Sequence, residues 1–369
     1  MKKILIVFGT RPEAIKMCPL VLELKRRSEL EIKVCLTGQH EFMLKQIMGC
    51  FQVNADYNLH IMKENQSLSD ITSATLCGLK EVLEKEYPDL VLVHGDTTTS
   101  FAAALQSFYF KIPVGHVEAG LRTGNKYSPY PEEMNRLMTD RIATYHFAPT
   151  ELNKENLIKE GINDNIFVTG NTVIDSFSTT IKNNYIFHEN KLNFIDYKKY
   201  KVILMTAHRR ENWGTALSEI CKAVKGIIAM HEDVWVIYPV HLNPNVRETV
   251  FTHLENVDRL SLINPVDVFD MHNLLNKCYM VMTDSGGLQE EAPFLGKPIL
   301  VLRTETERSE VITSGAAKLV GVNKNTIVQA ALELINNKKA YLKMQNSDSP
   351  YGDGNASKRI ANILSKNLF

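Results

Sequence analysis

Two carboxylates stand directly after apolar runs that are predicted to be buried strands, and they are well suited to move protons. Asp96 follows the run 90–94, and Glu118 follows the run 114–117. Loops at the carboxyl ends of neighbouring parallel strands share one edge of a sheet, so these side chains are expected in one layer. Two carboxylates close together raise each other's pKa, which favours general acid–base catalysis.

Each acid also has a plainer interpretation. Asp96 precedes a run of threonines, and an acid at such a point often only caps the helix that follows. Glu118 shortly precedes Arg122, with which it would form an ordinary ion pair. Glu133 lies on the first turn of a helix predicted after Pro131, where an acid often does no more than offset the helix dipole.

The first loop of the chain is suited to an anion. Gly9 follows the apolar run 4–8, and Pro12 fits the first turn of a helix. Free N–H groups at a helix start attract anions, and Arg11 and Lys16 add positive charge there. We predict that both cations contact phosphate, the alternative being two solvated cations at an ordinary turn. The loop has neither the G-x-G-x-x-G pattern nor a P-loop, so it gives no support to NAD or ATP.

A second cationic cluster begins the later half of the chain. His208 and Arg209 follow the apolar run 202–205. Cations at the end of a strand suit a phosphate or a leaving group. The alternative interpretation is a surface charge network.

The run 280–283 leads into Ser285, Gly286 and Gly287, the most informative cluster of the chain. Small residues at a helix start let a diphosphate approach the backbone N–H groups. Glu291, one turn further on, is placed to accept both hydroxyls of a ribose. A nucleotide diphosphate site is therefore predicted here, rather than a capped core helix alone.

The elements that must carry these residues follow one pattern, in which short β-branched runs alternate with longer amphipathic stretches. Continuous apolar strands that alternate with helices predict parallel sheets covered on both faces, an α/β fold. The expected strands cover residues 4–8, 32–36, 90–94, 114–117, 202–205, 234–238, 280–283 and 299–302.

The two halves of the chain begin alike, each with a strand that leads into a cationic loop. The length of 369 residues exceeds what one hydrophobic core usually serves. We predict two Rossmann-like domains facing a cleft. Residues 1–180 would carry the acid–base loops and residues 181–354 the nucleotide site, with a C-terminal helix over 355–369 packing back on the first domain.

Composition narrows the function classes. Lys+Arg and Asp+Glu both count 42, which argues against a nucleic-acid partner. The 6 cysteines are scattered, which fits a reducing compartment and argues against disulfides or a metal site. The run 4–8 is too short for a signal peptide, and no stretch approaches the roughly 20 apolar residues of a membrane span. We therefore expect a cytoplasmic protein with no membrane partner and no metal.

Taken together, the clusters resemble those of the non-hydrolysing UDP-N-acetylglucosamine (UDP-GlcNAc) 2-epimerases. The resemblance covers essentially the whole chain and depends on the order of the motifs rather than on any one of them. The motifs are Gly9–Met17 (GTRPEAIKM), Gly95–Thr98 (GDTT), His116–Thr123 (HVEAGLRT), Pro131–Arg136 (PEEMNR), His208–Asn212 (HRREN), Asp284–Pro293 (DSGGLQEEAP) and Thr306–Arg308 (TER).

The resemblance implies a glycosyltransferase-B-like fold, a homodimer, and UDP bound chiefly by the second domain, with no metal or nicotinamide cofactor. The implied reaction is reversible epimerisation of UDP-GlcNAc to UDP-ManNAc at C2. It would proceed by elimination of UDP to a 2-acetamidoglucal and re-addition, supplying ManNAc for surface polysaccharide. The alternatives are a hydrolysing 2-epimerase that releases UDP and ManNAc, a glycosyltransferase of the same fold, and an inactive UDP-sugar-binding regulator.

On the matching positions the resemblance also implies roles for single residues. The catalytic set would be Asp96, Glu118, Glu132 and His208. The residues that hold UDP or its phosphates, or orient a catalytic acid, would be Arg11, Lys16, Arg136, Ser285, Gly286, Gly287, Glu291 and Arg308. A second, activating UDP-GlcNAc would contact Gln39, His40, Arg209 and His241, although Phe42 and Asn65 depart from the family pattern in that region.

Overall fold

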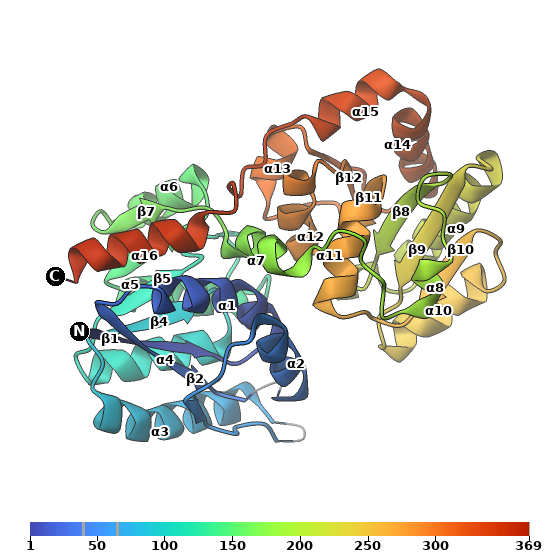
Figure 1. Cartoon of the computed structure of the whole chain (residues 1–369). Coiled ribbons are helices and arrows are strands. Elements are labelled where there is room, and N and C mark those ends of the chain that lie inside the picture. Colours follow the sequence, from blue (N-terminus) through green and yellow to red (C-terminus); the bar gives the residue numbers. More distant parts are fainter. Residues whose placement is uncertain (39–40, 64–65, 369) are drawn as a thin grey trace. The chain divides into compact units, whose positions relative to one another are not determined.

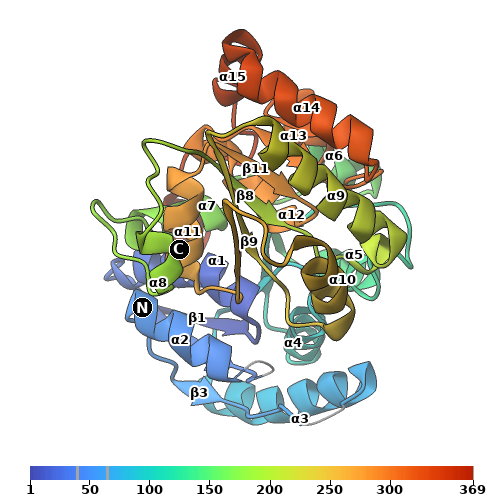
Figure 2. The ribbon, with the colours of Figure 1, turned by 90° about the vertical axis from the view of Figure 1, so that its right-hand side faces the viewer.

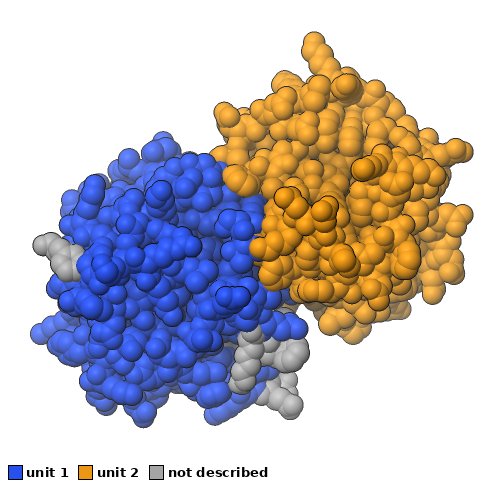
Figure 3. Space-filling view, viewed as in Figure 1, with its two compact units in different colours: residues 1–179, 351–369 blue, residues 180–350 orange. Residues whose placement is uncertain are grey.

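The structure, a computed structural model of the whole chain, describes residues 1–38, 41–63 and 66–368. The chain forms two compact units, coloured separately in Figure 3. Unit 1 comprises Met1–Thr179 and Tyr351–Phe369, and unit 2 comprises Thr180–Pro350. Each unit is built on a parallel sheet whose strands alternate with helices, so the predicted α/β fold with two Rossmann-like domains is confirmed.

Unit 1 contains a 7-stranded sheet in the order β3-β2-β1-β4-β5-β6-β7 (Figure 1). Its strands are β1 (Lys2–Phe8), β2 (Leu30–Leu36), β3 (Tyr57–Asn58), β4 (Leu90–His94), β5 (Val114–Val117), β6 (Tyr145–Ala148) and β7 (Ile166–Val168). The central strands β4 and β5 are buried along their whole length. Such continuous burial is what a parallel strand covered on both faces requires.

The helices of unit 1 include one that returns from the far end of the sequence. They are α1 (Arg11–Lys25), α2 (Glu41–Phe51), α3 (Leu68–Glu86), α4 (Thr98–Tyr109), α5 (Glu132–Ile142), α6 (Glu151–Lys159), α7 (Thr172–Thr180) and α16 (Ala356–Asn367). α16 lies beside α1 (Figure 1). Asp175 on α7 accepts hydrogen bonds from the N–H groups of Ala356 and Ser357, at 3.2 and 2.8 Å, and so caps the returning helix.

Unit 2 contains a 6-stranded sheet in the order β10-β9-β8-β11-β12-β13. Its strands are β8 (Lys201–Thr206), β9 (Val234–Pro239), β10 (Leu260–Ile263), β11 (Met280–Thr283), β12 (Ile299–Val301) and β13 (Ala317–Leu319). Its helices are α8 (Asn190–Asn193), α9 (Thr215–Met230), α10 (Pro244–Leu254), α11 (Val268–Lys277), α12 (Gly286–Glu291), α13 (Ser309–Thr313), α14 (Lys324–Asn336) and α15 (Lys338–Gln345). α9 and α14 lie side by side over the core of this unit (Figure 2).

The strand order reverses direction at one place in each sheet. In unit 1 the chain runs outward from β1 to β3 and then resumes on the other side at β4, and in unit 2 it does the same between β8 and β11. Open parallel sheets bind ligands at such a switch point, outside the carboxyl ends of the strands. The loops after β1, β4, β8 and β11 are therefore the places where a site is expected.

Among the helices of the described residues, none has the length and apolar character needed to cross a membrane.

Candidate active site

Asp96 lies in the loop between β4 and α4, one residue before the helix cap. The cap is Thr97, whose hydroxyl accepts a hydrogen bond of 3.0 Å from the N–H of Ser100, so the interpretation of Asp96 as the cap is wrong. The Asp96 side chain is 28% exposed, and its carboxylate accepts a hydrogen bond of 2.6 Å from the guanidinium of Arg136. Because Arg136 is buried on α5, it fixes the direction of this carboxylate.

Glu118 follows β5 with a left-handed backbone, φ 68°. Such a conformation costs a non-glycine residue on the order of 1–3 kcal/mol and clusters at functional sites. Its Oε2 accepts hydrogen bonds from Lys16 Nζ and, at 2.8 Å, from Asn171 Nδ2. Arg122, the alternative partner, instead forms an ion pair of 2.7 Å with Glu160, so the simple pair with Glu118 is wrong.

A buried histidine stands beside this carboxylate. The Nε2 atom of His94 lies 3.6 Å from Oε2 of Glu118. Burial lowers the pKa of the His94 imidazole to about 4, against the opposing pull of Glu118. The ring is therefore neutral near pH 7, and the positive charge in contact with Glu118 is that of Lys16.

The first turn of α5 carries two acids with different surroundings. Glu133 is buried and accepts hydrogen bonds of 3.0 Å from the N–H groups of Thr123 and Gly124. It also forms an ion pair of 3.3 Å with Arg136. These contacts give Glu133 a structural role, in line with the plainer interpretation of this acid. Glu132 lies on the same turn with a partly exposed side chain, so solvent can reach it.

The loop after β1 is closed by Glu13, a residue that the sequence analysis did not single out. Its Oε2 accepts hydrogen bonds from the N–H groups of Gly9 and Thr10, at 3.0 and 2.7 Å. Its Oε1 accepts hydrogen bonds of 2.8 Å from the hydroxyls of Thr97 and Ser100. Because these N–H groups are already bound, the helix-start argument for a phosphate does not apply to them. The available signal was a threonine followed three residues later by a glutamate, a capping box.

Gly9 has no room for a side chain, since a Cβ on this residue would lie 2.0 Å from Oγ1 of Thr37.

Arg11 is the first residue of α1 and has a partly exposed side chain. Of the two cations predicted to contact phosphate, Lys16 lies against Glu118. The phosphate contacts of Arg11 and Lys16 stay predictions.

The corresponding loop of unit 2, after β8, is closed by the fully buried carboxylate of Asp284. Its Oδ2 accepts hydrogen bonds from the N–H groups of His208 and Arg209, at 2.8 and 2.9 Å, and from Asn212 Nδ2 at 3.0 Å. The His208 ring stacks on His241 with centroids 5.4 Å apart. Burial lowers the pKa of the His208 imidazole, and the nearby Asp284 opposes this shift without cancelling it.

A cation lies over the start of α12, where the diphosphate is predicted. A Cβ on Gly286 would come within 2.7 Å of Cζ of Arg308, so a larger residue here would have to displace this guanidinium. Arg308 donates hydrogen bonds of 2.8 and 2.9 Å to Glu290 and also contacts Glu307. Ser285 is the N-cap residue of the helix. The structure thus brings together the glycine turn and the arginine that the sequence placed on separate loops.

The arginines of this region share one buried carboxylate, Glu307. It forms ion pairs of 2.8 Å with Arg303 and 3.7 Å with Arg209, besides its contact with Arg308. Burial by itself raises the pKa of Glu307, but these arginines outweigh burial and lower the pKa to about 2. Glu307 is therefore ionised at neutral pH and holds the cations in place.

Glu291, the predicted ribose ligand, ends α12. Its carboxylate lies 3.5 Å from Nε2 of His272 and 3.5 Å from the Cβ that an alanine at Gly287 would carry. His272 is buried on α11, and its Nδ1 lies 2.8 Å from the hydroxyl of Thr180. Sequence reasoning missed His272, because its contact with Glu291 depends on the packing of two helices.

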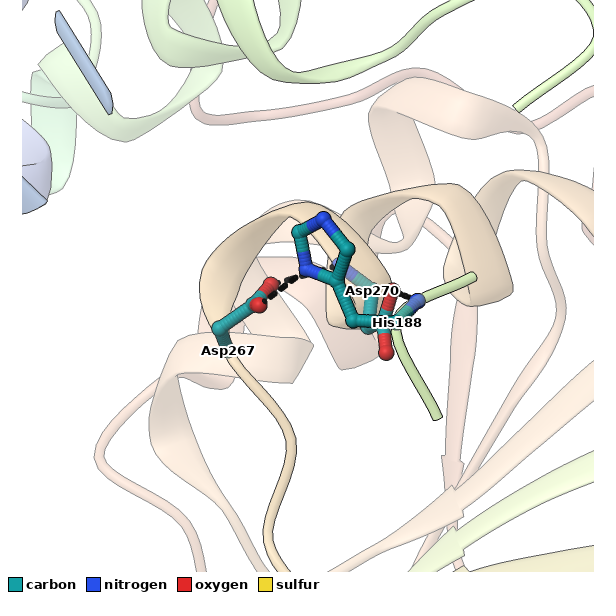
Figure 4. Close-up of side chains that lie close together, drawn as sticks. All are labelled: His188, Asp267 and Asp270. Carbon is teal, nitrogen blue, oxygen red and sulfur yellow. Dashed lines mark hydrogen bonds and ion pairs between the residues drawn. The ribbon is translucent and has the colours of Figure 1, made fainter. Parts of the chain in front are cut away.

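Among the described residues, one group of potential metal ligands lies within 4.8 Å of one another, and it comprises His188, Asp267 and Asp270 (Figure 4). Nδ1 of His188 lies 2.6 Å from Asp267. Asp270 accepts hydrogen bonds of 2.9 Å from the Tyr185 hydroxyl and the His188 N–H, and of 2.8 Å from the Glu189 N–H. These bonds fasten the segment before α8 to the start of α11, which is a structural role. No ligand spacing marked His188 in the sequence, because its partners lie far along the chain.

Two of the residues expected at a second nucleotide-sugar site, Gln39 and His40, lie outside the described residues. The other two lie near His208 in unit 2. His241 stacks on its ring, and Arg209 is its neighbour in the chain.

These features define a class of protein with two Rossmann-like units, in which one unit presents carboxylates after two neighbouring strands and the other presents cations around a glycine turn. A family model described as UDP-N-acetylglucosamine 2-epimerase matches residues 22–365. The chain belongs to this family, and the resemblance inferred from the motifs is confirmed.

Known relatives cover nearly the whole chain. It is 52% identical to a UDP-N-acetylglucosamine 2-epimerase of Bacillus subtilis (strain 168), over 98% of this chain and 94% of that protein. The solved structure of the Neisseria meningitidis enzyme bound to UDP-GlcNAc is 48% identical, with a TM-score of 0.92 over 99% of this chain and 100% of the other. A Methanocaldococcus jannaschii structure in complex with UDP-GlcNAc and UDP is 35% identical, with a TM-score of 0.82 over 99% of this chain and 100% of the other.

Proposed function

We propose that the protein interconverts UDP-GlcNAc and UDP-ManNAc by inverting C2, without releasing free sugar. The observation that carries this proposal is the pair of carboxylates after β4 and β5, each held by its own cation. Arg136 contacts Asp96, and Lys16 contacts Glu118. Inversion needs a proton removed from one face of C2 and another delivered to the opposite face, which calls for two acid–base groups in different places.

The chemistry of the substrate explains why cations are also needed. The C2 hydrogen of GlcNAc has no adjacent carbonyl, because the acetamide is attached through nitrogen. Its removal becomes feasible as the C1–O bond breaks and UDP leaves with the bonding electron pair. The product is a 2-acetamidoglucal, and UDP then adds back to C1 while C2 receives a proton on the other face. Cations placed at the phosphates stabilise the charge that develops on the leaving group.

The roles follow from this division. Asp96, Glu118 and Glu132 would be the acid–base groups, with Arg136 orienting Asp96 and Lys16 holding Glu118. Arg11, His208 and Arg308 would face the phosphates. Ser285, Gly286 and Gly287 would take the diphosphate at their N–H groups, and Glu291 would accept the ribose hydroxyls. Arg209 and His241, together with Gln39 and His40, would form an activator site, which a sigmoidal dependence of rate on UDP-GlcNAc would support.

The same proposal includes a cytoplasmic homodimer that supplies ManNAc for surface polysaccharide. An apolar hollow of about 560 Å³ between α4 and α5 supports a dimer, since a second subunit would cover such a surface. It is lined by Phe101, Leu105, Met134, Leu137, Met138, Arg141, Ile142 and Glu160. Sedimentation should give twice the chain mass, and Leu137→Asp should shift the protein toward monomer.

Proton NMR of the purified protein with UDP-GlcNAc alone in D2O tests the function. We expect UDP-ManNAc that carries deuterium at C2, with little free UDP. Stoichiometric UDP with free ManNAc would identify a hydrolysing epimerase. An unchanged substrate would favour an acceptor-dependent glycosyltransferase or a binding protein.

A further inference from the structure

The loop that carries Asp96 is fastened to β5 through both polar groups of one residue, Gly95. Its N–H donates a hydrogen bond of 2.8 Å to the carbonyl of Val117. Its carbonyl lies 2.7 Å from Nε2 of His116. A carbonyl oxygen only accepts hydrogen bonds, so Nε2 of His116 must donate here. The peptide group that leads into Asp96 is thus oriented by a histidine side chain.

The other nitrogen of the His116 ring points at a carboxylate. Nδ1 lies 2.5 Å from Oδ1 of Asp140, and both side chains are 0% exposed. Burial raises the pKa of Asp140, but His116 and Arg122 outweigh this and lower it to about 2. Asp140 is therefore ionised at neutral pH, and its carboxylate contacts the ring at Nδ1. Because each ring nitrogen has a contact, the ring cannot turn over without losing one on each side.

Asp96, which follows Gly95, is held by two residues of α5. Nδ2 of Asn135 donates a hydrogen bond of 3.0 Å to the carbonyl of Asp96, and Arg136 binds the Asp96 carboxylate at 2.6 Å. Asn135 and Arg136 lie on α5, as does Asp140, and His116 lies on β5. The position of Asp96 is thus set by its own side chain and by the carbonyl groups before and after it.

We propose that His116 is a positioning residue for catalysis, which holds the Gly95 carbonyl so that Asp96 meets the sugar at the correct distance. The inference rests on the proposed function, because it assigns proton transfer to Asp96. His116 does not touch the substrate in this account. A displacement of about 1 Å in a catalytic group costs on the order of 100-fold in rate, so the effect should appear in kcat.

Two substitutions separate this role from ordinary packing. In His116→Gln the longer side chain places an amide nitrogen near the position of Nε2 and can still donate to Gly95. In His116→Asn the shorter side chain places it near Nδ1 and can still donate to Asp140. We expect His116→Gln to retain kcat within several-fold and His116→Asn to lose about 100-fold in kcat. UDP affinity and KM should stay within about twofold in both, since unit 2 supplies the UDP contacts in the proposed function.

The outcomes separate the two proposals. A His116→Asn variant that is as active as His116→Gln, or a loss confined to KM, would overturn the positioning role while the epimerase function stands. A wild-type protein that makes no UDP-ManNAc would overturn the function itself.

Nitrogen-15 NMR of the wild-type histidines at pH 7 provides a measurement that needs no active or folded variant. A proton on Nε2 of His116 is expected. An unprotonated Nε2 would overturn the proposed contact with Gly95.

Discussion

In both units a carboxylate binds the backbone N–H groups of the loop after the first strand, but this carboxylate comes from a different element in each unit. In unit 1 the carboxylate is that of Glu13, which belongs to α1 and also binds the hydroxyl of Thr97 after β4. In unit 2 it is that of Asp284, which follows β11 and binds the N–H groups of His208 and Arg209 after β8. The two units thus stabilise equivalent loops with carboxylates that come from different places in the chain.

The units differ in the charges around this shared arrangement. In unit 1, Asp96 and Glu118 lie after the carboxyl ends of two neighbouring strands, and each contacts a cation. Unit 2 gathers Arg209 and Arg308 around the carboxylate of Glu307. In the proposed function the same scaffold supports proton transfer in one unit and anion binding in the other, because function depends on the side chains of a site and not on the fold.

The largest effect is expected in unit 1, where Asp96→Asn removes an acid–base group but keeps the shape of the side chain. It should lower kcat by about 10²–10⁴-fold, the usual contribution of a general acid or base. Because UDP is assigned to unit 2, its Kd measured by calorimetry should be unchanged. Glu118→Gln should behave alike. Weakened UDP binding with a normal kcat in either variant would contradict the assignment of proton transfer to unit 1 and of UDP to unit 2.

A buried neutral histidine in unit 1 should make stability depend on pH. The folded pKa of His94 is about 4, below its usual value of 6.5, so the unfolded chain binds a proton first. The contribution of His94 to the free energy of unfolding is complete above pH 6.5 and is lost as the pH falls toward 4. The drop should reach about 3 kcal/mol from this group. Urea unfolding across this range should show a shallower decline in His94→Gln, and parallel curves for the two proteins would contradict the assignment.

In unit 2 the matching substitution is Glu291→Gln, which removes the charge predicted to accept both ribose hydroxyls. Hydrogen bonds to a charged group contribute about 1.5–3 kcal/mol, so the Kd for UDP should rise by about 10-fold or more. Uridine should lose affinity in the same proportion, while inorganic diphosphate, tested as a competitor, should not. An equal loss of affinity for uridine and for inorganic diphosphate would mean that Glu291 acts on the phosphates or on the fold.

A smaller effect is expected for Gly286→Ala, since the new methyl group would meet the Arg308 guanidinium at 2.7 Å. The end of a flexible side chain can move, so we expect a loss of about 3–10-fold in UDP affinity, equivalent to about 1 kcal/mol. Gly226→Ala is the matched control in the same unit, because its Cβ would meet only Val328 at an ordinary 3.7 Å. Unchanged affinity in Gly286→Ala would remove Arg308 from the phosphate site.

The central strands could be predicted from the sequence, and the polar or short ones could not. The predicted runs 90–94, 114–117 and 280–283 coincide with β4, β5 and β11. Each run is short and contains apolar, partly β-branched residues, which favours a strand. β3 has only 2 residues, and β7 and β13 have 3 each, so their pattern is short. β12 also has 3 residues, but its apolar run continues to Leu302 and could be recognised.

The residue types and loops of the candidate site could be predicted from the sequence, but most contacts between its side chains could not. The positions of Asp96 and Glu118 follow from where a buried strand ends. The contacts of Lys16 with Glu118 and of His272 with Glu291 depend on packing between elements far apart in the chain. The anion site expected at Gly9 illustrates the limit, since Glu13 supplies a carboxylate from within the chain at the place where a phosphate was expected.

Hydrogen exchange of the whole protein with and without UDP tests the division between the units most directly. We expect UDP to slow exchange of the backbone amides from Ser285 to Glu291 and at His208 and Arg209, and Asp96→Asn to show the same protection. Protection confined to the loops after β1, β4 and β5, with none from Ser285 to Glu291, would contradict the assignment of UDP to unit 2.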